Sequence, residues 1–239
     1  LCRDWSSDVC SSDLGIYSGF KWRTSFGMIN FYADFFRFPA PKGTLRLPST
    51  GNEFLFSIRS KPIKALETHL QIKTENKEVL FGENIFREIT NRNRTNLRLD
   101  FTYTISKNLR SRTRFEINNF KIDGAEEAEK GFLTFQDFRV IVSRDFSIQS
   151  RIIFFKTDSF NAAIYEFEND VPGVMTNLPM FGSGMRWYLL VKYELFNVLD
   201  FSVKYSETYK PNERTLSSGN SEIFNNLDNR LNLQLDYRF

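Results

Sequence analysis

The C-terminal residues 229–239 alternate between apolar and polar side chains without interruption. Successive side chains of a strand point to opposite faces, so a period of two predicts a strand with one apolar and one polar face. Because the last residues of most soluble domains fray, an amphipathic strand at this position indicates that the end of the chain is part of the fold. The apolar face of this strand consists of Leu231, Leu233, Leu235, Tyr237 and Phe239.

The same period recurs along the chain. Within 97–105, for example, Leu97, Leu99 and Phe101 alternate with polar residues. Alternation and turn-forming residues together predict eleven strands. We expect them at 16–24, 27–38, 52–60, 65–76, 94–106, 108–120, 131–143, 146–156, 185–195, 199–209 and 229–239.

The connections between these strands alternate in length. Short connections are expected at 24–26, 61–64, 107, 144–145 and 196–198, and long ones at 39–51, 77–93, 122–130, 157–184 and 210–228. Outer-membrane barrels combine tight periplasmic turns with long extracellular loops, and their strands of about 9–11 residues are longer than those of soluble proteins. The pattern predicts an all-β fold, an antiparallel up-and-down transmembrane β-barrel with every short connection on one side.

The composition agrees with this fold. Aromatic residues make up 16% of the chain, Phe alone occurs 26 times, and the net charge is only +3. No apolar stretch approaches the roughly 18 residues of a membrane helix. Aromatic residues near strand ends suit the interfacial girdles of a barrel, although they suit the core of a soluble sandwich as well. The small, dispersed charge does not favour nucleic-acid binding.

The first residues differ from the rest. Read back through the genetic code, residues 4–14 match a short-read sequencing adapter, so we expect 1–14 to be a non-native, adapter-derived segment and 15–239 to be the barrel region. A genuine polar N-terminal segment is the alternative. Both cysteines, Cys2 and Cys10, lie in this segment, so we expect no thiol chemistry. The missing signal peptide is then uninformative, because truncation would remove it.

Eleven strands also raise a question of parity, because bacterial single-chain barrels have an even number. Either one strand is missing from this count, with 161–175 as its place, or at least one strand precedes the chain. We favour the second interpretation, in which the chain is the C-terminal portion of a larger barrel.

Four stretches resemble a known family: FYADFFRFP at 31–39, GFLTFQDFRV at 131–140, FKTDSFNAAIYEFENDVPG at 155–173 and GSGMRWYLLVKYE at 182–194. They are similar to the C-terminal barrel region of long helix-hairpin-helix proteins of didermic bacteria. The chain end also resembles the closing strand of outer-membrane barrels, which implies outer-membrane lipid and the barrel assembly machinery as partners. The residues implied in that recognition are Leu233, Leu235, Tyr237 and Phe239. DNA binding is not implied, because the helix-hairpin-helix segment is absent.

Basic residues on the predicted strands are candidate lumen residues, because a charge facing lipid costs about 2–4 kcal/mol at the midplane. A basic wall would favour anionic solutes. Alternatively, these residues pair with Asp100, Glu116 and Asp137 and brace the barrel. The candidates are Arg98, Arg110, Arg112, Arg114, Arg139, Arg151 and Arg186.

Other polar groups give weaker signals. His69, the single histidine, lies on a polar strand face; a hydrolase would need it beside Ser57 or Ser60, without any supporting motif. Glu166, Glu168 and Asp170 belong to the longest connection, where we expect a solvated face rather than a calcium site, or else a strand rising above the membrane.

We therefore expect an outer-membrane barrel, acting as a pore, receptor or structural barrel, with no catalysis and no cofactor or metal. The alternatives are a soluble or surface-exposed β-sandwich that binds a ligand or glycan and, less favoured, an outer-membrane hydrolase.

Overall fold

The computed structural model of this protein describes residues 14–40, 45, 47–82, 87–195, 198–217, 219 and 222–237. Of the predicted N-terminal segment, residues 1–13 lie outside this part, whereas Leu14 begins the first strand and pairs with Arg37. Arg238 and Phe239 also lie outside it. No helix in the described ranges is long and apolar enough to cross a membrane.

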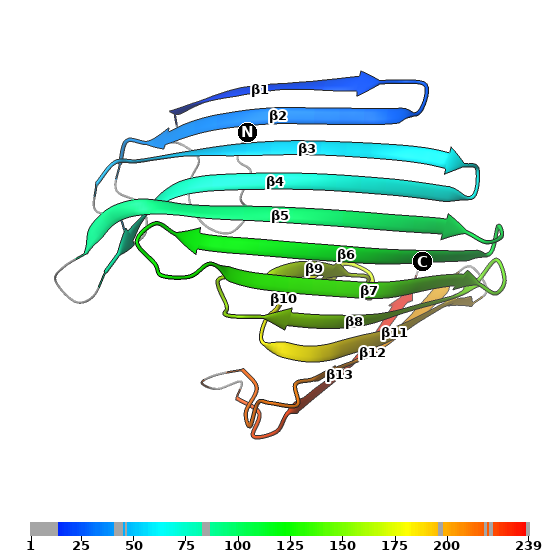
Figure 1. Cartoon of the computed structure of the whole chain (residues 1–239). Coiled ribbons are helices and arrows are strands. Elements are labelled where there is room, and N and C mark those ends of the chain that lie inside the picture. The colour runs from blue at the N-terminus through cyan, green and yellow to red at the C-terminus, as the bar shows by residue number, and fades with distance from the viewer. Residues whose placement is uncertain are drawn as a thin grey trace.

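The fold is all-β and antiparallel (Figure 1). In the described chain, eleven strands form one up-and-down sheet in the order β1-β2-β3-β4-β5-β6-β7-β8-β11-β12-β13, and β9 and β10 form a separate hairpin. The strands are β1 (Leu14–Arg23), β2 (Gly27–Phe38), β3 (Ser49–Ile63), β4 (Leu66–Phe81), β5 (Glu88–Thr104), β6 (Leu109–Ile122), β7 (Glu129–Ile141), β8 (Phe146–Thr157), β9 (Ile164–Glu168), β10 (Thr176–Met180), β11 (Ser183–Leu195), β12 (Leu199–Tyr209) and β13 (Leu227–Tyr237).

The sheet is curved and open. It curls beyond β8, so that β11 to β13 turn below and behind β8 in Figure 1, and β1 and β13 are its two edges. Because the strands alternate in direction, β1 and β13 run the same way. Direct pairing of the two edges would therefore be parallel, unlike every other pair in the sheet.

The eleven predicted strands correspond to the eleven strands of the sheet, and the short and long connections alternate as predicted. Local hydrogen bonds define the tight turns. Between β5 and β6, for example, the hydroxyl of Ser106 accepts hydrogen bonds from the backbone N–H groups of Asn108 and Leu109, at 3.2 and 3.1 Å. A side-chain oxygen of this kind closes a turn without help from the rest of the fold.

Two predictions about connections are corrected. The expected loop at 77–93 is mostly strand, because β4 continues to Phe81 and β5 begins at Glu88. Polar pairs hold this extension together, such as Asn76 and Asn93, whose amides bond at 2.8 Å. Polar residues occupy both faces around this pair and the apolar residues Val79, Leu80 and Phe81 are consecutive, so the extension shows no apolar alternation.

The second correction concerns 161–175. A strand does lie there, β9, but it pairs with β10 and does not join the main sheet. It therefore does not supply an additional strand of the main sheet, which keeps eleven strands in the described residues. The hairpin lies on the concave side of the sheet, where Ile164 and Met180 pack against Leu133, Phe135, Ile153 and Phe155 of β7 and β8.

Candidate functional site

The sheet has an apolar convex face and a charged concave face. On β5, Leu97 and Leu99 point outward, whereas Arg98 and Asp100 point inward toward the hairpin. Leu97 is 38% exposed although Asp100 is only 4% exposed. This is the reverse of a water-soluble protein, in which charged side chains are rarely buried and large apolar patches are rarely exposed.

The outward apolar residues form a band with a definite upper boundary, toward the long connections. On each strand the boundary is marked by the polar outward residue that directly follows the uppermost apolar residue of the band. From β2 to β13 these residues are Arg37, Asn52, Thr74, Thr95, Asn119, Lys130, Lys156, Ser183, Glu207 and Asn229. Below this boundary the outward positions of these described strands carry no Asp, Glu, Lys or Arg.

Polar side chains inside the band bond to one another where β6 meets β7. Thr113 donates a hydrogen bond to Gln136 Oε1 at 2.6 Å, and Gln136 Nε2 donates to Ser111 Oγ at 2.7 Å. Groups that bond to one another in this way cost little in an apolar environment. The band is therefore compatible with contact to hydrocarbon along its whole length.

The upper boundary runs obliquely across the strands. The row of paired residues that starts at Asn229 of β13 reaches Gly27 on β2, ten residues before the boundary residue Arg37. At about 3.3 Å per residue and about 4.8 Å per strand spacing, over nine spacings, the boundary climbs about 33 Å across about 43 Å of sheet. The strands are thus tilted by about 35–40° from the normal to the band, close to the tilt of membrane barrels.

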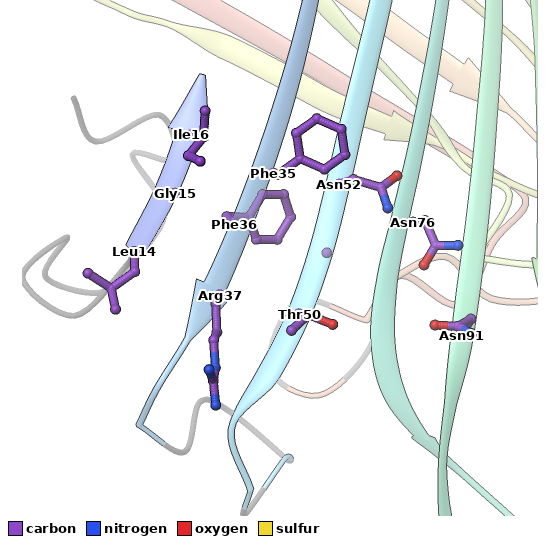
Figure 2. A pocket seen from close by; sticks show the side chains of 11 residues that line it. Leu14, Gly15, Ile16, Phe35, Phe36, Arg37, Thr50, Asn52, Asn76 and Asn91 are labelled. Carbon is purple, nitrogen blue, oxygen red and sulfur yellow. The ribbon is translucent and has the colours of Figure 1, made fainter. Parts of the chain in front are cut away.

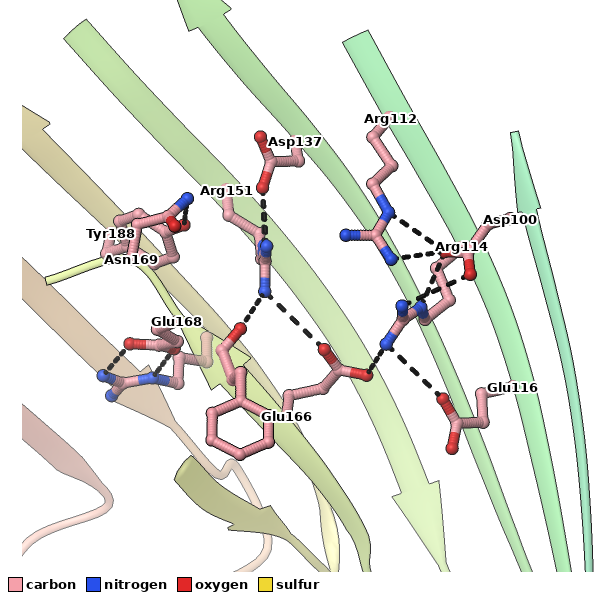
Figure 3. Close-up of polar contacts among 12 residues, drawn as sticks. Asp100, Arg112, Arg114, Glu116, Asp137, Arg151, Glu166, Glu168, Asn169 and Tyr188 are labelled. Atoms are coloured by element: carbon pink, nitrogen blue, oxygen red, sulfur yellow. Dashed lines mark hydrogen bonds and ion pairs between the residues drawn. The ribbon is translucent and has the colours of Figure 1, made fainter. Parts of the chain in front are cut away.

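On the concave face, the basic residues of β5 and β6 pair with acidic residues of the same sheet (Figure 3). Arg98 binds Glu116 through two hydrogen bonds of 2.7 and 3.0 Å. Arg112 and Arg114 both donate to Asp100, with Arg114 Nε 2.8 Å from Oδ1. These three arginines thus pair with Glu116 and Asp100, as the second alternative predicts, whereas a role in bracing a barrel stays a prediction.

The hairpin adds its own acidic residues to this face. Arg114 Nη1 lies 2.7 Å from Glu166 Oε1, and Arg151 Nη1 lies 3.6 Å from Glu166 Oε2. Arg151 also holds Asp137 of β7 at 2.6 Å and donates to the backbone carbonyl of Phe167 at 2.7 Å. Glu166 thus lies between two arginines that each keep a carboxylate partner from the sheet (Figure 3).

Further along the hairpin, Glu168 lies between β11 and β12. Arg186 donates from Nε and Nη2 to the two oxygens of Glu168 at 2.6 and 2.9 Å, and Lys204 Nζ lies 3.0 Å from Oε2. Lys204 also holds Asp170 at 2.8 Å, and Asn232 of β13 donates to the same carboxylate at 3.3 Å. The side chain of Glu168 is 0% exposed.

The beginning of the hairpin segment is held by polar side chains on β5 and β6. Arg94 Nη2 donates to the carbonyls of Asn161 and Ala163 at 3.2 and 2.8 Å, and Asn118 donates to those of Ala162 and Ala163. Gly131 of β7 permits the close approach, since a Cβ there would lie 2.3 Å from the carbonyl oxygen of Ala162. The segment 161–180 thus contacts strands from β5 to β13.

Burial and ion pairing shift the pKa values of the three hairpin carboxyl groups in different directions. Burial raises the pKa of Glu166 above its ordinary value, against the opposing charge of Arg114. Burial acts in the same direction on Glu168, but the hydrogen bond and charge of Arg186, with the charge of Lys204, lower the pKa of Glu168 overall. The pKa of Asp170 is lowered as well, against burial, by hydrogen bonds from Lys204 and Thr176. Glu168 and Asp170 are therefore the more firmly ionised members of the group.

The seven predicted arginines share the concave face. Arg98, Arg112, Arg114, Arg151 and Arg186 belong to the ionic network, whereas Arg110 and Arg139 are exposed and lie opposite each other on β6 and β7. Of the proposed closing-strand residues, Leu233, Leu235 and Tyr237 face outward and are 62–67% exposed; Phe239 lies outside the described residues.

The remaining candidates are placed as follows. His69 Nδ1 lies 3.6 Å from Asp100 Oδ2. Ser57 accepts a hydrogen bond from Asn30, and Ser60 donates to the carbonyl of Phe26, so neither serine is bonded to His69 in the described structure. The solvated face expected for Glu166, Glu168 and Asp170 is wrong, because they are buried in ion pairs. No group of three or more His, Cys, Asp or Glu within the described ranges could hold a metal ion.

A separate hollow lies between β1 and β3, near Leu14 of β1, Arg37 of β2 and Thr50 of β3 (Figure 2). Ile16, Phe35, Phe36 and Asn52 line it, together with Gly51. A Cβ on Gly51 would lie 2.5 Å from a ring carbon of Phe36, so the glycine permits this ring to lie across β3. The hollow mixes residues of both faces at the open edge of the sheet, and no ionic cluster lines it.

No protein-family model matches this chain, and no curated protein matches it. The resemblance to the helix-hairpin-helix barrel proteins therefore stays a prediction.

Proposed function

We propose that the chain forms part of the wall of a transmembrane β-barrel in a bacterial outer membrane and serves as a passive pore, receptor or structural barrel without catalysis. The oblique, uncharged outer band carries this proposal. A flat apolar layer would account for a band whose upper boundary keeps one direction across ten strands, because every strand would leave the layer at the same height. A lipid bilayer provides such an environment, and water does not.

The two faces also weigh against a soluble sandwich. In a sandwich, the apolar face of one sheet is covered by a second sheet. In the described structure the one additional element, the β9–β10 hairpin, covers the charged face instead, and outward residues such as Phe115, Phe154 and Leu189 are 40–49% exposed. Lipid would cover these side chains without any second layer of protein.

The open sheet is completed, under this proposal, by further strands between the edges β1 and β13. An odd number of added strands would let all neighbours pair in antiparallel fashion, as in bacterial barrels. The convex face would contact outer-membrane lipid, and the exposed outward residues of β13 would be presented to the barrel assembly machinery. Membership of the helix-hairpin-helix barrel family is part of the same proposal.

Heat-modifiable mobility tests the proposal. The chain, refolded in detergent or lipid vesicles, is run on a denaturing gel with and without boiling. A folded barrel or barrel assembly resists the detergent and migrates differently after boiling, so we expect two mobilities. A chain that partitions into the aqueous phase and shows one mobility in both lanes would contradict the proposal.

A further inference from the structure

Arg186 and Lys204 differ from the other basic residues of the concave face in the origin of their partners. When the hairpin is disregarded, Arg114 keeps Asp100, and Arg151 keeps Asp137. Arg186 keeps a hydrogen bond to the hydroxyl of Thr208, at 2.6 Å, and Lys204 keeps the ring of Tyr188, 4.8 Å from its ammonium. Within the described residues, every carboxylate bound to Arg186 or Lys204 comes from the segment 164–180.

These two residues have the geometry of a carboxylate receptor. The guanidinium of Arg186 binds Glu168 with two parallel hydrogen bonds, the arrangement that makes arginine selective for carboxylates and phosphates. The ammonium of Lys204 bridges the carboxylates of Glu168 and Asp170 at 3.0 and 2.8 Å. Asn232 donates to the second carboxylate. The wall thus holds two neighbouring carboxylates at once.

We propose that Arg186, Lys204, Thr208 and Asn232 form a binding site for a small multivalent carboxylate, which the hairpin occupies in cis through Glu168 and Asp170. The site faces the barrel interior, so its access from the lumen rests on the proposed function. A solute carrying two carboxylates takes the places of Glu168 and Asp170 when the hairpin lifts from the wall.

The hairpin competes strongly because it is tethered. A group on a short tether is present at an effective concentration in the millimolar range, and the apolar contacts of Ile164 and Met180 add to its hold. A free carboxylate must exceed that concentration, or the hairpin must be absent. Removal of the hairpin therefore provides the sharpest test.

The strand register shows how to remove it. Lys156 of β8 pairs with Ser183 of β11, and the N–H of Thr157 donates to the carbonyl of Gly182 at 2.7 Å. The two strands are thus already neighbours where the hairpin leaves the wall. Replacing residues 158–181 by Asn-Gly, a preferred two-residue turn, joins β8 to β11 directly.

Citrate is the probe, and its affinity for the refolded chain in detergent is measured by calorimetry at low salt. We expect the hairpin-free chain to bind citrate at least tenfold more tightly than the parent chain. Arg186→Gln in the hairpin-free chain should abolish that gain. Arg114→Gln is the matched control, since Asp100 already neutralises Arg114, and it should leave citrate affinity within threefold.

A hairpin-free chain that keeps heat-modifiable mobility but binds citrate no better than the parent would overturn the inference and leave the barrel intact. A gain in affinity without heat-modifiable mobility would support the site and contradict the barrel. If the hairpin-free chain does not fold, the inference is tested on the parent chain instead. Citrate at 100 mM should accelerate hydrogen exchange in β9 relative to sodium chloride of equal ionic strength, and an unchanged rate would overturn the inference.

Discussion

Replacement of Glu168 by glutamine should release the hairpin from the wall. The variant keeps the shape of the side chain but removes a fully buried charge that contacts Arg186 at 2.6 Å and Lys204 at 3.0 Å. Removing one partner of a buried ion pair costs about 3–5 kcal/mol, because the remaining charge stays buried without compensation. Within the described residues Arg186 loses its one carboxylate partner, whereas Lys204 keeps Asp170, so we expect the docking free energy to fall by an amount in that range.

Hydrogen exchange of the β9 amides measures this change directly. Each 1.4 kcal/mol corresponds to a factor of ten, so protection should fall by about two to three and a half orders of magnitude. The main sheet, whose strands are paired independently of the hairpin, should keep its protection.

Glu166→Gln is the matched comparison. Arg114 and Arg151 keep Asp100 and Asp137 in this variant, and burial already disfavours the charge of Glu166. The loss should resemble that of an ordinary hydrogen bond, about 0.5–1.5 kcal/mol. If Glu166→Gln loosened β9 as much as Glu168→Gln, the distinction between sheet-paired and hairpin-paired cations would be refuted.

Two further outcomes are expected for the hairpin and one for the outer band. Gly131→Ala should loosen the hairpin, because the added Cβ would lie 2.3 Å from the carbonyl of Ala162; unchanged β9 exchange would show that this approach is not required. Lowering the pH should release the hairpin below about pH 4.5. Docking lowers the pKa of Glu168 and of Asp170, so their contribution to docking stability is complete above the ordinary values of 4.5 and 3.8 and is lost as the pH falls through the docked-state values. Glu166, whose pKa is raised, contributes to docking stability in the opposite sense. Exchange in β9, corrected for intrinsic rates, should therefore rise in acid, and a constant rate from pH 7 to pH 3 would contradict this account. Leu99→Arg, inside the outer band, should impair vesicle insertion by about 2–4 kcal/mol, whereas Asn119→Arg at its upper boundary should cost about 0–1 kcal/mol; equal insertion of the two variants would argue against the band.

The wall could be predicted from the sequence because each of its strands carries its own signal. Residues such as Leu97 and Leu99 belong to one continuous apolar face, so the period of two is visible strand by strand. The upper parts of β4 and β5 lack this signal, because polar pairs such as Asn76 and Asn93 lie there on the outward face as well. Strand length above the band therefore depends on cross-strand contacts that no single segment reveals.

The buried face of the hairpin could not be predicted from its own residues. Its alternation predicts that Glu166 and Glu168 face water, whereas they are buried and Tyr165 and Phe167 are exposed. This inversion arises because the partners of the acidic residues lie on other strands, among them Arg114, far away in the sequence. Lys204 was missed for a similar reason. The one available signal was its position as a single cation among serines on the polar face of β12.

The central claim, that the convex face contacts lipid, is tested most directly by spin labels on adjacent residues of one strand. With Cys2 and Cys10 replaced by serine, nitroxides are attached in turn at residues 97 to 101 of β5 in vesicle-inserted protein. Labels at Leu97, Leu99 and Phe101 should collide with oxygen dissolved in the bilayer, and labels at Arg98 and Asp100 should not. If the outward labels instead collided preferentially with a water-soluble nickel complex, the convex face would be in water and the account would be wrong.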